Sequence, residues 1–95
     1  MDLTEFRSSV AHEAPPEGLG LALQTLWWDA KGDWNRAHQC AQEDHGPTGS
    51  IVHAYLHRKE GDLSNAGYWY RHAGRPPTTG PLEAEWEALA RELLA

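Results

Sequence analysis

Cysteine is almost absent from this chain, which carries only Cys40 among its 95 residues. An internal disulfide is therefore excluded, and a lone thiol is typical of proteins from a reducing compartment. The first residues also lack the basic and then apolar pattern of a secretory signal peptide. These features together predict a cytoplasmic protein.

Long apolar runs and positive charge are scarce as well. The longest apolar run, residues 19–28, is interrupted by Gly20, Gln24 and Thr25 and is shorter than the ~20 residues of a membrane helix. Eight Lys and Arg stand against 14 Asp and Glu, which gives a net charge of −6. Nucleic acids and anionic membranes both attract cationic surfaces. We therefore expect no nucleic-acid partner and no membrane partner.

Recognisable catalytic and nucleotide-binding motifs are missing. Gly18-Leu19-Gly20 lacks the third glycine and the preceding strand of a dinucleotide loop, and neither a Walker motif nor a Gly-x-Ser-x-Gly elbow occurs. Cys40 has His38 and Asp44 nearby on one predicted helix but no identifiable oxyanion site. We predict no catalytic residue, a non-enzymatic protein, and a small buried side chain at Cys40.

What the chain does contain is a repeated turn motif. Residues 31–37 and 60–66 each contain Gly-Asp followed by Ala four residues later, and each lies between two helical patterns. Glycine suits the left-handed residue that ends a helix, and aspartate caps the helix that follows. Each motif thus predicts a helical hairpin. Because a hairpin cannot bury its apolar face alone, neighbouring hairpins are expected to stack.

The predicted fold is all-α, with stacked antiparallel helical hairpins and a C-terminal capping helix in one domain over residues 1–95. Its expected parts are an N-terminal helix (1–14), a degenerate first repeat (18–45), a second repeat (49–75) and the capping helix (80–95). Apolar residues at helical spacing predict the core. These rows are Leu3, Phe6 and Val10; Leu19, Leu23, Leu26, Trp27 and Ala30; Trp34, Ala37 and Ala41; Ile51, Val52, Ala54, Tyr55 and Leu56; Leu63, Ala66, Tyr70 and Ala73; and Leu82, Trp86, Leu89 and Leu93, with Glu85 among the polar residues opposite the last row.

The second repeat resembles one unit of the tetratricopeptide and Sel1-like repeat families. The likeness lies in Gly61-Asp62-Leu63, Ala66, Tyr68-Trp69-Tyr70-Arg71, Ala73-Gly74 and the proline that follows. The first repeat shares only Gly32-Asp33-Trp34 and Ala37 with this pattern. Residues 52–62 also resemble a segment of small uncharacterised bacterial proteins, which implies nothing about activity. The resemblance to the repeat families implies a scaffold that binds proteins or peptides.

Aromatic and basic residues gather in the second repeat. Tyr68, Trp69 and Tyr70 are consecutive and span about 200° of helix, so at least one must be exposed. Residues 53–75 contain four basic and two acidic residues, in contrast to the rest of the chain. Such a cluster is either a solvated surface or a site for a protein, an acidic peptide, a phosphate-bearing group or a second copy in a homodimer. The predicted partner-binding residues are Tyr68, Trp69, Arg71, Arg75, Arg58 and Lys59.

Histidine supports an alternative function. His53 and His57 are spaced i, i+4 and share one helix face, so they could hold a zinc ion in a metal-binding or metal-dependent hydrolytic protein. His72, Cys40 or a carboxylate would then be the third ligand. Ala54 stands where the His-Glu-x-x-His motif of metalloproteases has glutamate. Both rings could instead fill the interface between two helices, near Ala66 and Tyr70. The sequence leaves both interpretations open.

Overall fold

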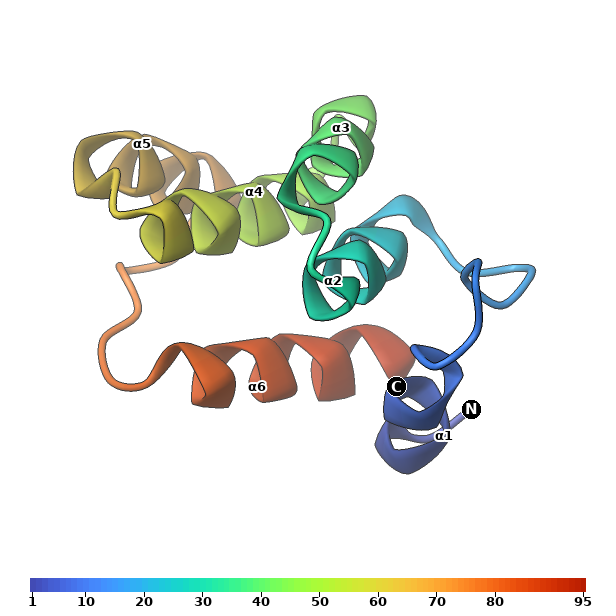
Figure 1. Ribbon diagram of the computed structural model, residues 1–95. Helices are drawn as coiled ribbons and strands as arrows, with labels where there is room; N and C mark the ends of the chain where they lie inside the picture. The colour runs from blue at the N-terminus through green and yellow to red at the C-terminus, as the bar shows by residue number, and fades with distance from the viewer.

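The computed structural model describes residues 1–95 and contains six helices and no strand, so the predicted all-α class is confirmed. The helices are α1 (Leu3–Ser9), α2 (Leu21–Lys31), α3 (Trp34–Glu43), α4 (Pro47–Glu60), α5 (Leu63–Ala73) and α6 (Leu82–Leu94), as Figure 1 shows. None of them combines the length and the apolar character of a bilayer-crossing segment.

The two Gly-Asp turns have nearly the same conformation. Gly32 and Gly61 both lie in the left-handed region, with φ values of 90° and 91°, and end α2 and α4. The side chains of Asp33 and Asp62 then cap α3 and α5 by accepting backbone hydrogen bonds, at 3.0 and 3.1 Å. Because left-handed φ strains a residue with a Cβ, glycine is the residue that permits each two-residue turn.

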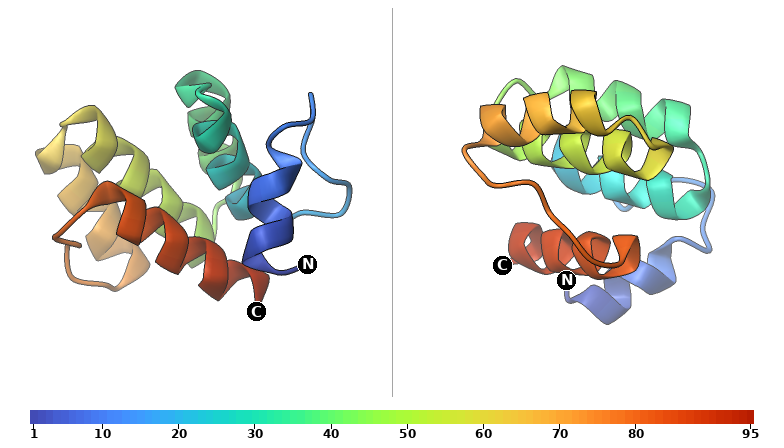
Figure 2. Two further views of the ribbon diagram at one scale, coloured as in Figure 1. Left: turned by 60° about the horizontal axis from the view of Figure 1, so that its bottom comes forward. Right: turned by 90° about the vertical axis from the view of Figure 1, so that its left-hand side faces the viewer.

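Helix α4 is the centre of the molecule. It packs most extensively on α5 and also contacts α2, α3 and α6, whereas α2 packs mainly on α3. Figure 1 shows α6 crossing beneath α2 and α4. Figure 1 and the left view of Figure 2 show α1 beside the C-terminal end of α6, with the two termini close together. This central position explains why every residue from 49 to 57 is buried.

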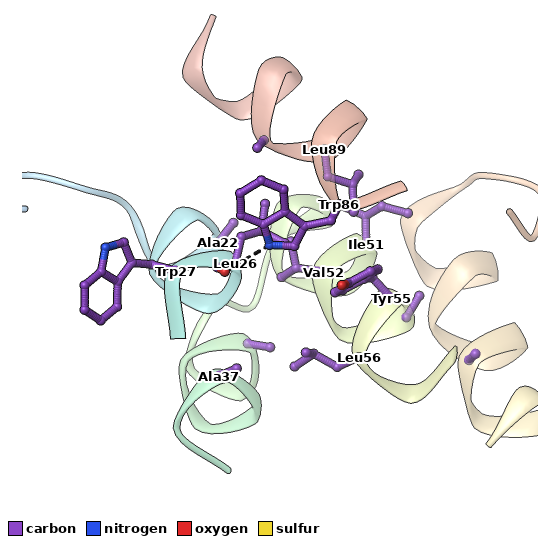
Figure 3. Close-up of a cluster of buried hydrophobic side chains, with 14 of the residues drawn as sticks. Ala22, Leu26, Trp27, Ala37, Ile51, Val52, Tyr55, Leu56, Trp86 and Leu89 are labelled. Atoms are coloured by element: carbon purple, nitrogen blue, oxygen red, sulfur yellow. Dashed lines mark hydrogen bonds between the residues drawn. The ribbon is translucent and has the colours of Figure 1, made fainter. Parts of the chain in front are cut away.

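The core joins α6 to α2 and α4 (Figure 3). Trp86 lies between these helices, and its indole Nε1 donates a hydrogen bond to the Leu26 carbonyl at 3.0 Å. Trp27 points to another side of α2, where its Nε1 donates to Ser9 Oγ at 3.0 Å. Each predicted row of apolar residues contributes to this core. The buried members are Phe6, Leu26, Trp27, Ala37, Ala41, Ile51, Val52, Ala54, Tyr55, Leu56, Ala66, Tyr70, Trp86 and Leu89.

The predicted burial or exposure of three residues is wrong. Leu63, expected in the core, is 69% exposed, because it lies at the tip of the hairpin, beyond the end of α4. Ala30 is exposed, and the neighbouring Asp29 is buried instead. Glu85, expected to face solvent, is only 4% exposed because it accepts hydrogen bonds from two side chains of the second hairpin, Arg58 and Tyr70.

Candidate functional site

Three histidine side chains converge between the two hairpins. His53 and His57 lie one turn apart on α4 and are 4% and 6% exposed, whereas His38 comes from α3 and is half-buried. One ring nitrogen of each lies within 4.8 Å of the others. The structure therefore brings together a set of nitrogen donors that no single helix could supply.

Hydrogen bonds orient these rings. The Nε2 atoms of His38 and His53 are 3.0 Å apart, so one of them carries a hydrogen and donates a hydrogen bond to the other. His57 Nδ1 lies 2.6 Å from Glu60 Oε2 and, as the donor to that carboxylate, leaves Nε2 as the acceptor nitrogen. The Asn65 side-chain amide then donates to His57 Nε2 at 3.3 Å.

Two tryptophans enclose the histidines. Trp34 stacks on His38, with ring centroids 4.7 Å apart and planes 11° from parallel. Trp69 stacks on His53 at 4.0 Å and 13°. Trp34 is itself held by a hydrogen bond from its Nε1 to the Leu56 carbonyl at 3.2 Å. Stacking by Trp34 of α3 and by Trp69 of α5 thereby sets the planes of two of the three imidazoles.

The buried environment keeps two of the imidazoles neutral. Burial, followed by the charges of His38 and His57, lowers the pKa of His53 to about 4. Burial also lowers the pKa of His38, and the charge of His57 acts in the same direction. A neutral imidazole has one nitrogen with a free lone pair, which is the form that binds a metal ion.

His72, the third ligand expected from the sequence, lies outside this set. It is exposed on α5, and its Nε2 is 3.0 Å from the hydroxyl of Tyr68. His72 does line a cavity of about 370 Å³ together with His53, Trp69 and Asp44. His38 was not among the ligands predicted from the sequence, although the i, i+4 spacing of Trp34 and His38 indicates one shared face of α3.

The predicted partner-binding cations do not form one open surface. Arg58 lies 2.9 Å from Glu85, and Lys59 lies 2.8 Å from the buried Asp29. Arg75 forms two hydrogen bonds with Glu92, of which one measures 2.9 Å. These three cations are therefore engaged within the chain and help to hold the helices together.

Tyr68 and Arg71 lie on the outer side of α5, whereas Trp69 stacks on His53 of the histidine cluster. Tyr68 is 46% exposed and Trp69 is half-buried, whereas Tyr70 is buried, so the prediction that one of the consecutive aromatic residues is exposed is confirmed. Arg71 is exposed and is the one arginine of the chain that forms no ion pair. A cation without a carboxylate thus lies beside an accessible aromatic ring.

The fold and these side chains define an all-helical protein with an aromatic histidine cluster between two hairpins. The chain matches no family model, no curated protein and no solved structure. Its function is therefore argued from the geometry of its own residues.

Proposed function

We propose that this protein is a non-enzymatic interaction module, built from two helical repeats of the tetratricopeptide or Sel1-like kind, that binds a protein segment bearing a carboxylate. The observation that carries the proposal is the unpaired Arg71 beside the exposed ring of Tyr68. The other cations of the second repeat, Arg58, Lys59 and Arg75, support the scaffold that presents this surface.

The matching turns support the repeat architecture. Gly32 and Gly61 have φ values that differ by one degree, 90° and 91°, and each is followed by an aspartate cap. In both turns the glycine N–H bonds the carbonyl three residues earlier, and the aspartate N–H bonds the carbonyl five residues earlier. Two hairpins with the same turn, in contact through α3 and α4, support the proposed repeat architecture.

The side chains around Arg71 suit protein recognition. Tyrosine, tryptophan and arginine are the residues that most often dominate binding energy at protein interfaces. A guanidinium that lacks an internal partner can bind a carboxylate with two parallel hydrogen bonds. Tyr68 and Trp69 would then cover an apolar part of the same segment. We therefore assign the contact to Tyr68, Trp69 and Arg71.

Peptide selection with purified protein tests this assignment. We expect immobilised protein to enrich peptides that combine Asp or Glu with an apolar side chain, and the Arg71→Gln variant to lose them. The Arg36→Gln variant is a matched control, because Arg36 is exposed on α3 and is paired with Asp33. Equal binding by both variants, with the fold verified by circular dichroism, would refute the assignment.

Light scattering on the same variants separates a foreign partner from self-association. A dimer that dissociates in Arg71→Gln but persists in Arg36→Gln would assign the surface to a second copy of the chain. A monomer in every variant supports a heterologous segment as the ligand. A dimer that neither variant dissociates would show that self-association uses another surface.

A further inference from the structure

We propose that His38, His53 and His57 bind one divalent transition-metal ion, with Zn²⁺ as the preferred metal. The three ligands do not include the docking residues Tyr68, Trp69 and Arg71, although Trp69 stacks on His53, and neither proposal requires the other. The inference depends on three observations, namely the convergence of three imidazoles, the carboxylate behind one of them and the partial exposure of His38.

The separation between the ring nitrogens of His38 and His53 is close to that of a tetrahedral site. Zn–N bonds of about 2.0–2.1 Å at the tetrahedral angle place two ligand nitrogens about 3.3 Å apart. The Nε2 atoms of His38 and His53 are 3.0 Å apart, and all three donor atoms lie within 4.8 Å of one another. Binding of the ion then requires the nitrogen of His57 to move closer to the other two.

Glu60 prepares His57 as a ligand. Metal-binding histidines usually donate their second ring N–H to a carboxylate or carbonyl, which fixes the tautomer and makes the ligand nitrogen more basic. Glu60 Oε2 has this position at His57 Nδ1, at 2.6 Å. The Asn65 amide contacts His57 Nε2 at 3.3 Å, a long hydrogen bond that an ion can replace.

The donor set selects the class of metal. Imidazole nitrogen suits Zn²⁺, Ni²⁺ and Cu²⁺, whereas Mg²⁺ and Ca²⁺ require oxygen ligands. Three protein nitrogens leave a fourth tetrahedral position for water or a small anion. His38 is half-buried and His53 lines the cavity of about 370 Å³, so the cluster adjoins space for such a ligand.

Cobalt titration tests the site directly. Protein freed of metal with a chelator is titrated with Co²⁺, whose tetrahedral complexes absorb visible light much more strongly than the hydrated ion. We expect one equivalent of Co²⁺ to produce this spectrum and Zn²⁺ to abolish it by displacement. The absence of a tetrahedral spectrum together with no zinc binding by calorimetry would overturn the proposal.

Matched variants locate the ion. His38→Ala is expected to abolish stoichiometric binding, whereas His72→Ala removes an exposed histidine outside the cluster and is expected to bind as the native protein does. Unchanged binding in His38→Ala would overturn the proposal, because the ion would then lie elsewhere, for example at His57 with the exposed Glu60 and Asp62.

A conservative variant keeps the test valid if His38→Ala does not fold. Glu60→Gln retains the three nitrogen ligands but removes the carboxylate, and changes of this kind typically weaken metal binding about 10–100-fold. We expect that loss for Zn²⁺, with Arg71→Gln as a control that binds zinc normally. If Glu60→Gln binds Zn²⁺ as tightly as the native protein, the proposed role of Glu60 is wrong.

Discussion

Asp29 and Glu85 are buried carboxylates that each accept hydrogen bonds from one tyrosine and one cation. Asp29 receives them from the Tyr55 hydroxyl and from Lys59 Nζ, both at 2.8 Å. Glu85 receives them from the Tyr70 hydroxyl at 2.6 Å and from Arg58 at 2.9 Å. Burial and then the hydrogen bond to Glu85 raise the pKa of Tyr70 to about 12. Since a buried charge is costly unless it is paired, these partners make both carboxylates tolerable.

Replacement of Glu85 should be far more costly than replacement of an exposed glutamate. Glu85→Ala leaves Arg58, whose side chain is 14% exposed, without its carboxylate. Breaking a buried pair in this way costs about 3–5 kcal/mol. Glu92→Ala breaks the exposed pair with Arg75 and should cost less than about 1 kcal/mol. Urea unfolding of both variants measures the difference, and equal losses would contradict it.

Non-local pairing explains why the predicted exposure of Glu85 is wrong. Glutamate opposite an apolar helix row normally faces solvent, and only the fold places Arg58 and Tyr70 beside this one. The same limit applies to the histidines. The spacing of His53 and His57 was visible along one helix, whereas the approach of His38 depends on how α3 packs against α4.

Local sequence signals were sufficient to predict the two turns and the helices on either side of them. Both Gly-Asp turns lie between two helices, as the sequence predicted. Two helix starts differ. Helix α2 begins at Leu21 rather than near Gly18, which has a positive φ of 85°. Helix α4 begins at Pro47, before residue 49, where the second repeat was expected to start. Proline is tolerated there because the first residues of a helix lack internal N–H partners.

Two glycine substitutions, one in the second turn and one inside α5, should change the stability of the fold in opposite directions. Gly61→Ala places a Cβ on a residue with φ of 91°, although no atom lies within 4 Å of that Cβ, so the cost is backbone strain of about 1–2 kcal/mol. Gly67→Ala lies inside α5, where its Cβ would meet only Arg71 at 3.5 Å, and should stabilise the protein by up to about 1 kcal/mol. Thermal unfolding monitored by circular dichroism gives both signs. A loss of stability in Gly67→Ala, or none in Gly61→Ala, would contradict this account.

At the scale of the whole molecule, the contacts that matter most join segments far apart in the sequence. Trp86 bonds α6 to α2, Glu85 bonds α6 to α4 and α5, and Lys59 bonds α4 to Asp29 on α2. Simple repeat proteins have contacts only between neighbouring units and can unfold unit by unit. Here α6 contacts both hairpins, so neither hairpin can unfold without exposing part of the interface of the other.

We therefore expect this protein to unfold in one cooperative transition. The five tryptophans lie on α2, α3, α5 and α6, so their fluorescence reports tertiary packing across the molecule, whereas far-UV circular dichroism reports helix content. In urea, both signals should change with the same midpoint and the same slope, because a two-state transition has no populated intermediate. Separate midpoints would show that one hairpin persists alone, and the contacts made by α6 would then be too weak to couple the two repeats.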